Sequence, residues 1–231
     1  MRQNVYDYSF EMRRERQRNV SLSFLVILSI IAFLSVFMTF VLFPIHVSSD
    51  SMESDLSKNG AAFVCPLSRS PKRGEVIYLS RLDGKENTLF ENIVNVIVDV
   101  FTAQHYHPFG YSTNLTGKPC VRRVLALPGD SLYMKDYILY VKPAGQDYYL
   151  TEFEVAEKPY NIHIYSVPAQ WDGVGLKGDM KEITLGENQY FVLADNRIES
   201  ADSRLWGSID KKMIRGKVVL QYFPFTKIRL F

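Results

Sequence analysis

A strong charge imbalance and an ample supply of cysteine are both missing from this sequence. Its 231 residues carry 27 Lys and Arg against 25 Asp and Glu, a net charge of +2. Nucleic-acid-binding domains usually present a clustered basic face, so this balance gives no support for a nucleic-acid partner. The two cysteines, Cys65 and Cys120, are too few for a disulfide scaffold. Their positions fit either a pair or two separate buried side chains.

Internal repeats, heptads and a second long hydrophobic run are also absent. The nearest to such a run is the segment 90–101, which is too short to span a bilayer and contains Glu91 and Asp99. It fits a helix on the membrane surface, or the simpler alternative of core packing. The apolar fraction is 47%, so the chain does not belong to the disordered class and can bury a core.

One hydrophobic run is present, near the N-terminus. Residues 21–43 read SLSFLVILSIIAFLSVFMTFVLF and contain no charge. A helix of this length spans the hydrocarbon core of about 30 Å. A secretory signal peptide would have a shorter apolar stretch and a small-residue cleavage site, which residues 43–46 do not provide. We therefore predict a transmembrane anchor over residues 21–43.

The flanking charges predict how this anchor is oriented. Four arginines lie within residues 13–18, just before the run, and no Lys or Arg follows it until Lys58. Positively charged flanks stay in the cytoplasm. The sequence therefore predicts a single-pass protein of the cell membrane with three parts: a cytoplasmic segment 1–20, the anchor 21–43 and an extracytoplasmic domain 44–231.

The remainder of the chain reads as short strands separated by turns. Runs of β-branched and aromatic residues are bounded by turn signals such as Pro128-Gly129-Asp130. This pattern predicts a mostly β module. The segment 143–180 is rich in Tyr, Pro and Gly and is a candidate inserted subdomain. We expect strands at residues 61–64, 76–80, 121–125, 131–134, 137–141, 190–193 and 218–222.

Three segments carry side chains suited to chemistry. The first, SSDSM at residues 48–52, lies just beyond the anchor. The second is RRVLALPGD at residues 122–130, and the third is ADNRIESADSRLWG at residues 194–207. Taken singly, they fit a linker, a turn and a loop held by ion pairs. Their order along the chain, after the predicted anchor, is more specific and can be compared with the motifs of known families.

In this order the segments resemble the type I signal peptidases, the membrane serine proteases that cut signal peptides from exported proteins. That family's boxes run Ser-x-Ser-Met-x-Pro-Thr, Arg-Gly-Asp-(Ile/Val), Lys-Arg-Val-x-Gly-x-Pro-Gly-Asp and Gly-Asp-Asn-Arg-x-x-Ser-x-Asp-Ser-Arg-x-x-Gly. Here they appear as SDSMESD, RGEV at residues 73–76, RRVLALPGD and ADNRIESADSRLWG. The resemblance extends to about Tyr222. It implies a signal-peptidase-like fold of antiparallel β-sheets behind one transmembrane helix.

The resemblance also implies a serine nucleophile with a lysine base, and neither metal nor cofactor. Its implied partners are signal-peptide-bearing preproteins and membrane lipid. Ser51 takes the nucleophile position, where its hydroxyl attacks the scissile carbonyl and forms an acyl-enzyme. Ser49 matches the oxyanion-hole hydroxyl, which acts with the Ser51 backbone N–H. The other matching positions are Met52, which lines the site, Ser200, which orients the base, the bracing pair Asp202 and Arg204, and the supporting residues Asp195 and Asn196.

The base position departs from the family pattern. Arg122 stands where the family has lysine, and the residues around it fix that register. A buried lysine can become neutral, whereas a guanidinium keeps its charge and can donate to a serine but cannot take its proton. Two other bases are near in sequence. Lys118 lies about 13 Å from Arg122 along an extended strand, and His46 lies almost at the membrane exit.

Other family positions are relaxed as well. Ser54-Asp55 replaces Pro-Thr, and Ala126 and Ala194 replace glycines. Two hypotheses follow: a working signal peptidase with an atypical base, or a catalytically impaired paralogue that binds exported segments or partners without cutting them. A self-cleaving repressor would share a Ser–Lys dyad, but such proteins are soluble and the anchor argues against that class.

Overall fold

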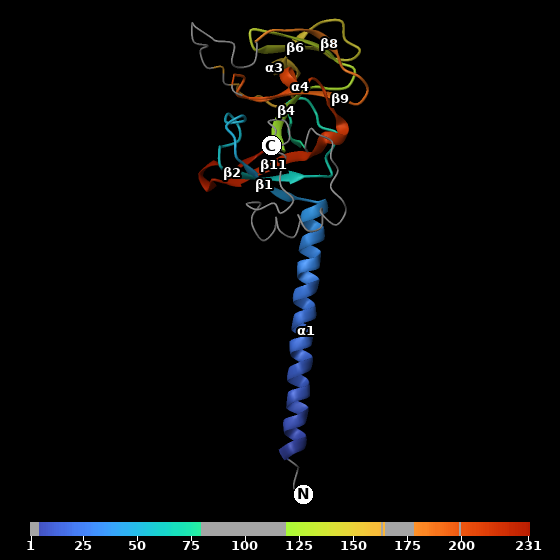
Figure 1. The fold of residues 1–231 in the computed structure, drawn as a ribbon, viewed down its shortest axis with the longest axis vertical. Coiled ribbons are helices and arrows are strands. Elements are labelled where there is room, and N and C mark those ends of the chain that lie inside the picture. The colour runs from blue at the N-terminus through green and yellow to red at the C-terminus, as the bar shows by residue number, and fades with distance from the viewer. Residues whose placement is uncertain (1–4, 80–118, 163, 165–177, 199) are drawn as a thin grey trace.

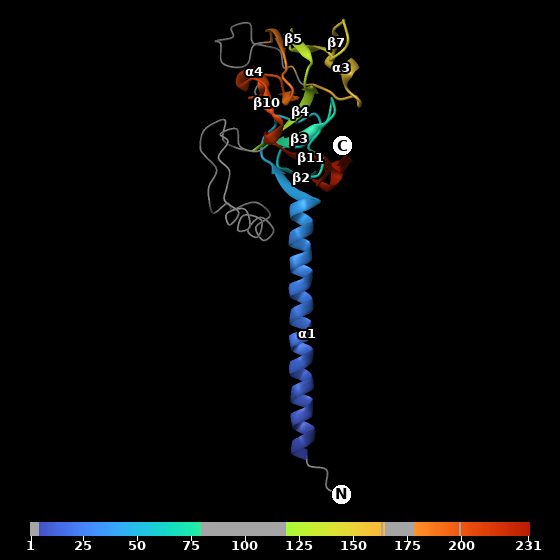
Figure 2. The same cartoon turned by 90° about the vertical axis from the view of Figure 1, so that its right-hand side faces the viewer.

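The N-terminal element is one long helix that stands apart from a β domain. In the computed structural model, α1 (Val5–Phe40) is a single helix of 36 residues, and Figures 1 and 2 show it projecting from the domain as a rod. Its part from Met12 to Leu34 is long and apolar enough to cross a membrane, and the rest of the protein buries none of it. The structure describes residues 5–79, 119–162, 164, 178–198 and 200–231.

The helix ends earlier than the hydrophobic run does. That run predicts a helix to Phe43, but α1 stops at Phe40, and Phe43 opens the strand β1 (Phe43–Val47). Pro44 explains the difference, because the residue before a proline is pushed out of the helical region into an extended conformation. Phe43 pairs instead with Val64 across the sheet. The chain therefore enters the β domain directly from the helix.

The larger sheet has eight antiparallel strands. Its order is β1-β2-β11-β3-β4-β9-β10, with β12 beside β11. The strands β1, β2 and β11 lie at the end of the domain that α1 enters (Figures 1 and 2). The remaining bounds are β2 (Gly60–Cys65), β3 (Val76–Leu79), β4 (Cys120–Ala126), β9 (Gln189–Leu193), β10 (Ile209–Asp210), β11 (Ile214–Phe223) and β12 (Arg229–Leu230), with the short helices α4 (Ser203–Trp206), η1 (Lys211–Met213) and η2 (Phe225–Lys227) between or beside them.

A smaller sheet of order β7-β6-β5-β8 lies at the opposite end of the domain from α1 (Figures 1 and 2). Its central hairpin turns at Asp136 and Tyr137, whose φ angles are 51° and 65°. Two consecutive positive φ values give the turn that matches the twist of paired strands. Tyr137 is therefore a turn residue, although the sequence places it in a strand. The elements are β5 (Ser131–Lys135), β6 (Ile138–Lys142), β7 (Leu150–Thr151), α3 (Glu152–Val155) and β8 (Met180–Thr184).

The strand β4 runs through the centre of the core. Six of its seven residues are buried, and its side chains enter three different hydrophobic clusters: Val121 packs with β1 and β2, Val124 with β3 and β9, and Leu125 with the smaller sheet. Two arginines, Arg122 and Arg123, lie in this buried strand. Buried charges need partners, so the neighbours of these two arginines define the polar centre of the domain. The mostly β, antiparallel architecture expected from the sequence is confirmed.

The two cysteines do not form a disulfide. Cys65 and Cys120 are both free, because β11 and β3 separate β2 from β4. Three strand spacings of about 4.8 Å lie between them, well beyond the Cα separation of about 7 Å that a disulfide tolerates. The segment 90–101 and Lys118 lie outside the described residues. The described part of 143–180 contributes β7 and α3 to the smaller sheet.

Candidate active site

The loop after β1 carries the first predicted site residues and is held rigidly by its core contacts. Met52 is fully buried in the cluster beneath β1 and β2. Its carbonyl accepts hydrogen bonds from the N–H groups of Asp55 at 3.0 Å and Leu56 at 2.6 Å. The carbonyl of Ser51 accepts one from the N–H of Asn196 at 3.0 Å. These bonds join the loop to the third sequence segment, which lies far away along the chain.

Ser51, Ser49 and Arg122 meet in space. The Oγ atoms of Ser51 and Ser49 are 2.9 Å apart, and Arg122 donates from Nη1 to Ser51 Oγ at 2.9 Å. Ser51 is 6% exposed, whereas Ser49 is open to solvent. The cluster is therefore a buried hydroxyl between a permanent cation and a second, accessible hydroxyl. The Oγ of Ser51 accepts a hydrogen bond from Arg122. The Ser51 hydroxyl can therefore donate its own proton in a hydrogen bond to Ser49.

Neutral groups hold the guanidinium of Arg122. Its Nε and Nη2 atoms donate to the carbonyl of Ala201 at 2.9 and 2.6 Å, and Nη1 also donates to the carbonyl of Val121 at 2.6 Å. The ring of Trp206 lies 5.6 Å from the guanidinium carbon, within range of a cation–π contact. The site thus supplies the additional acceptors that an arginine needs in place of a lysine.

Arg123, the next residue on β4, is the centre of a second network of hydrogen bonds and ion pairs. It donates to both carboxylate oxygens of Asp195 at 2.9 and 2.6 Å, and to Asp55 at 2.6 Å. Burial alone would lower the pKa of Arg123, but the hydrogen bonds and charges of Asp195 and Asp55 raise it. Ser54 donates to Asp195 at 2.6 Å. The pair Ser54-Asp55, which departs from the family pattern, is therefore an integral part of the polar core.

Asp202 and Arg204 form a third buried arrangement. Asp202 caps α4 and accepts from the backbone N–H of Arg204 at 3.1 Å, from Nε at 2.9 Å and from Nη2 at 2.7 Å. It also accepts from the N–H of Ala194 at 3.2 Å. The two side chains are 0% and 4% exposed. The pair thus ties the loop after β9 to the end of that strand, as a bracing pair would.

Ser200 lies in the loop that holds Arg122, but its hydroxyl does not form the expected hydrogen bond to the side chain at the base position. It is 5% exposed, and its Oγ has no hydrogen-bond partner in the described part of the chain. The resemblance assigns this serine to the base, yet Arg122 instead binds the carbonyl of the next residue, Ala201.

Glu152 is a residue of this region that sequence reasoning missed. It forms an ion pair with Arg197, and both side chains are completely buried. Glu152 also accepts from the N–H of Leu139 at 3.0 Å and from the hydroxyl of Tyr160 at 2.5 Å. The charge of Glu152 raises the pKa of Arg197 although burial acts to lower it. Arg197 belongs to the third sequence segment, whereas Glu152 lies in the unassigned stretch 143–180 and has no local signal.

The remaining predicted positions have simpler surroundings. Ala126 and Ala194 are both fully buried, and Ala126 packs in the cluster under the smaller sheet, so the methyl that replaces hydrogen there fills core space. His46 lies on β1 opposite Ala61 with its side chain exposed. Lys118 is outside the described residues.

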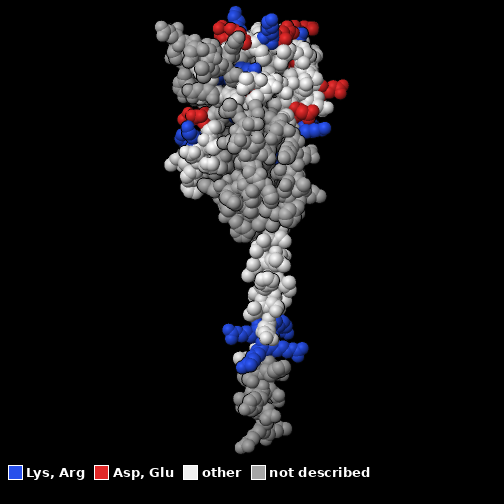
Figure 3. Space-filling view, in the orientation of Figure 1, with Lys and Arg blue, Asp and Glu red and all other residues white. Residues whose placement is uncertain are grey.

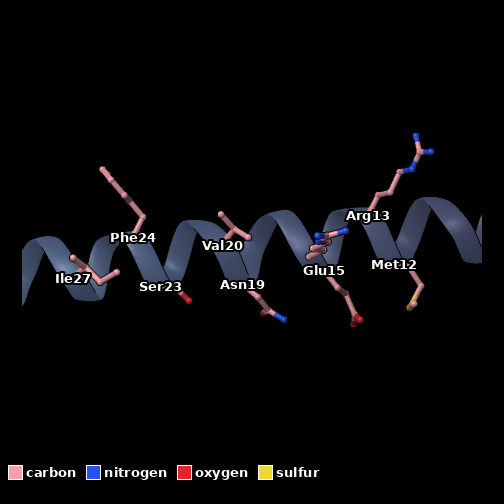
Figure 4. Close-up of a pocket in the computed structure, with 9 residues that line it drawn as sticks. Met12, Arg13, Glu15, Asn19, Val20, Ser23, Phe24 and Ile27 are labelled. Carbon is pink, nitrogen blue, oxygen red and sulfur yellow. The ribbon is translucent and has the colours of Figure 1, made fainter.

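The hollow in Figure 4 is unrelated to this site. All nine residues that line it belong to α1, between Met12 and Ile27. Ile27 precedes the end of α1 at Phe40 by 13 residues, which is about 20 Å along a helix. The hollow is the flank of the isolated helix, and the cluster around Ser51 remains the candidate site.

The fold and the cluster together define a mostly β domain behind one apolar helix, with a buried serine hydroxyl held by an arginine. The sequence model of the signal peptidase family, peptidase S26, matches residues 21–223. The chain therefore belongs to the signal peptidase family S26, as the resemblance of its motifs suggests.

Two curated relatives from Bacillus agree with this assignment. The chain is 38% identical over 112 residues to signal peptidase I of Bacillus licheniformis, covering 47% of this chain and 53% of the relative. It is 34% identical over 115 residues to signal peptidase I U of Bacillus subtilis, with coverages of 49% and 55%. The chain thus spans about half the length of the curated relatives it matches. A solved signal peptidase I from Enterococcus faecalis is 19% identical, with a TM-score of 0.32 and coverages of 64% and 95%.

Proposed function

We propose that this protein acts on the signal peptides of exported preproteins and cleaves them as a type I signal peptidase-like serine endopeptidase. The contact that carries the proposal is the meeting of Ser51 with Ser49 and Arg122, from segments 71 residues apart in the chain. These residues occupy the nucleophile, oxyanion and base positions of the family's motifs. The relatives from Bacillus are named signal peptidases I.

In the proposed reaction, Ser51 Oγ forms a bond to the scissile carbonyl carbon, the C–N bond breaks, and the peptide nitrogen takes a proton from water and leaves as the amine. Arg122 cannot accept the Ser51 proton, because a guanidinium stays protonated. It stabilises negative charge that develops on Oγ, while the Ser49 hydroxyl, 2.9 Å away, accepts the proton in a relay to solvent. Water then hydrolyses the acyl-enzyme. Because hydroxide is the final proton acceptor, the cleavage rate is expected to rise with pH.

The proposed location is the extracytoplasmic face of the cell membrane. The arginines between residues 13 and 18 form a basic cluster on α1, and an uncharged length of helix separates this cluster from the domain (Figure 3). The positive-inside rule then places the N-terminus in the cytoplasm and the β domain outside. Ser51 follows the end of α1 by 11 residues, so a signal peptide that emerges from the bilayer meets the site close to the membrane.

The bonding of Arg122 favours a second candidate function: binding of signal peptides without cleavage. Arg122 makes four hydrogen bonds, donates in every one, and includes Ser51 among its acceptors. A general base typically contributes about 10²- to 10⁴-fold to the rate of such reactions. A site in which a permanent donor replaces that base is suited to holding a peptide rather than cutting it.

A preprotein cleavage assay separates the two candidates. The full chain is purified in detergent and incubated, between pH 6 and 10, with a preprotein whose signal peptide ends in a small-x-small motif. The variants are Ser51→Ala, Arg122→Lys and, as a matched control, Arg215→Lys, since Arg215 is exposed on β11. Product is identified by its new N-terminus.

Each function predicts a different pattern. A working peptidase cleaves as wild type and as Arg215→Lys, and Ser51→Ala abolishes cleavage. A non-cleaving binder shows no turnover as wild type but gains it in Arg122→Lys. If neither wild type nor Arg122→Lys releases mature protein at any pH, the peptidase proposal is wrong. If the two cleave equally fast, the second candidate is removed.

A further inference from the structure

Arg122 differs from the other buried arginines of the domain in lacking a counter-ion. Arg123, Arg197 and Arg204 have side chains that are at most 4% exposed, and each forms an ion pair with a carboxylate. Arg122 is 6% exposed, yet no carboxylate pairs with it within the described residues. A buried cation is stable only when it is paired and well hydrogen-bonded, so the uncompensated charge of Arg122 indicates a site for an anion.

The existing contacts of Arg122 orient its charge without neutralising it. Two backbone carbonyls and the Ser51 hydroxyl accept its bonds, and Trp206 lies beside it. A guanidinium has five N–H groups. Four hydrogen bonds are recorded, two from Nη1 and one each from Nε and Nη2. One N–H on Nη2 is therefore left for a further acceptor.

Independent donors near Arg122 also lack acceptors. The hydroxyl of Ser200 and the indole N–H of Trp206 are buried and have no hydrogen-bond partner in the described structure. Ser200 adjoins Ala201, whose carbonyl holds Arg122, and Trp206 ends the short helix α4 that follows. Buried polar atoms in native proteins are nearly always hydrogen-bonded. This part of the domain thus contains a cation and unsatisfied donors together, and is short of acceptors.

We propose that the Ser49–Ser51–Arg122 cluster is a binding site for the free C-terminal carboxylate of a peptide. The planar guanidinium suits a carboxylate better than any other anion that a peptide supplies, and a peptide's terminal carboxyl is ionised at neutral pH. Exposed Ser49 opens the cluster to solvent. Ser49 and Ser51 donate to the carboxylate from one side while Arg122 neutralises it from the other.

The expected ligand is a released signal peptide, or any peptide that ends in the same small residues; this choice rests on the proposed function. Cleavage at the Ser51 hydroxyl would convert the scissile carbonyl carbon into a carboxylate at the same place. The protein therefore holds the cut end of the peptide more tightly than the uncut chain. In a cleaving protein this gives competitive inhibition by product, and in a non-cleaving one it gives a receptor for peptide ends.

The test compares peptides that differ only at the C-terminus. Three fluorescein-labelled peptides with an Ala-x-Ala end are titrated with the full chain in detergent at pH 7: the free acid, the amide, and an amide whose last residue is Asp. Anisotropy gives each Kd. The proteins are wild type, Arg122→Gln, Arg122→Lys and the surface control Arg215→Gln, and thermal unfolding reports whether each variant folds.

The site is expected to prefer the free acid. Wild type and Arg215→Gln bind the acid at least tenfold more tightly than either amide, a difference of about 1.4 kcal/mol. Arg122→Gln removes the preference, and Arg122→Lys keeps part of it because the charge remains. Equal affinities of acid and plain amide for wild type, or no binding of either, overturn the proposal. Tighter binding of the Asp-ended amide than of the free acid identifies a side-chain carboxylate as the ligand and overturns the choice of a peptide end.

Two further results separate this inference from the proposed function. An acid preference that survives in folded Arg122→Gln contradicts the role given to Arg122. If Arg122→Gln does not fold, the comparison of Arg122→Lys with wild type decides, because a lysine that discriminates better than arginine contradicts the role given to the remaining guanidinium N–H of Arg122. The cleavage assay is run on the same samples. Cleavage without an acid preference rejects the carboxylate site alone, whereas an acid preference without cleavage rejects peptidase activity alone.

Discussion

Replacing Glu152 by glutamine should destabilise the domain more than any surface charge change. Glu152 and Arg197 form an ion pair whose two side chains are completely buried. Glutamine keeps the shape, but the N–H of Leu139 and the hydroxyl of Tyr160 donate to different carboxylate oxygens, at 3.0 and 2.5 Å, so the single amide oxygen can keep only one of these bonds. The substitution therefore removes the negative charge together with one acceptor, and leaves the Arg197 cation in the core without a counter-ion.

The size of the effect follows from that burial. Removing one partner of a buried ion pair typically costs about 3–5 kcal/mol. Because glutamine also loses one of the two acceptors, we expect a cost within this range rather than below it. A domain of this size has a free energy of unfolding of about 5–15 kcal/mol, so the variant loses a large fraction of its stability. Arg197 lies beside Asp195 and Asn196 in the third segment, so any surviving activity should fall as well.

Urea unfolding of the full chain in detergent, followed by tryptophan fluorescence, measures the change. Glu157→Gln is the matched control: it lies just beyond the same short helix, and its ion pair with Lys72 is mostly exposed at 53% and 64%. Such a surface pair contributes at most about 1 kcal/mol. If Glu152→Gln and Glu157→Gln unfold at the same urea concentration, the argument that the buried pair holds the third segment is refuted.

Three further predictions concern single groups. The hydrogen bond from Tyr149 to Glu182, with the burial and charge around it, raises the pKa of Tyr149 to about 12. The contribution of this hydrogen bond to folding stability is therefore present below pH 10 and is lost as the pH rises through 12. An absorbance titration should therefore show one phenol near 12, which moves back towards 10 in Glu182→Gln. Burial raises the pKa of the Cys120 thiol, so alkylation followed by mass spectrometry should be slower for Cys120 in the folded than in the unfolded protein, and both cysteines should react without prior reduction. Asp202→Asn leaves buried Arg204 unpaired and should cost about 3 kcal/mol of stability, together with any cleavage activity; urea midpoints and the preprotein assay measure both, and an unchanged midpoint contradicts the bracing role.

The local character of the chain could be derived from the sequence alone. Runs of β-branched and aromatic residues with turn signals predicted the strands that became β2, β3, β4, β5, β6 and β9 to within one residue at each end, whereas β11 begins four residues before its predicted start. These properties follow from neighbouring residues, because strand formation and turns depend on short-range sterics. The end of the helix at Phe40 could also have been predicted from the sequence, because Pro44 disfavours a helical conformation at the residue before it.

The composition of the polar core depended on the tertiary structure. Ser54 and Asp55 depart from the family pattern, which by itself suggests a weakened active site. Both nevertheless form hydrogen bonds within the network around Arg123 and Asp195. Their partners come from strands that are remote in sequence, and no local pattern encodes such a meeting. Glu152 escaped notice for the same reason, because its partner Arg197 is 45 residues away.

Arg122 illustrates which properties of a residue follow from the sequence and which depend on the fold. The sequence alone determined that a permanent cation occupies the base position, because the chemistry of a guanidinium does not depend on its surroundings. It also determined the long apolar helix, the order of the motifs and hence the family. Only the folded chain decided what that cation does: it places Ser51 and two carbonyls at the donors of Arg122, whereas it pairs each of the buried Arg123, Arg197 and Arg204 with a carboxylate. Burial and three-dimensional pairing set the energy of a charge, and neither is a property of the linear sequence.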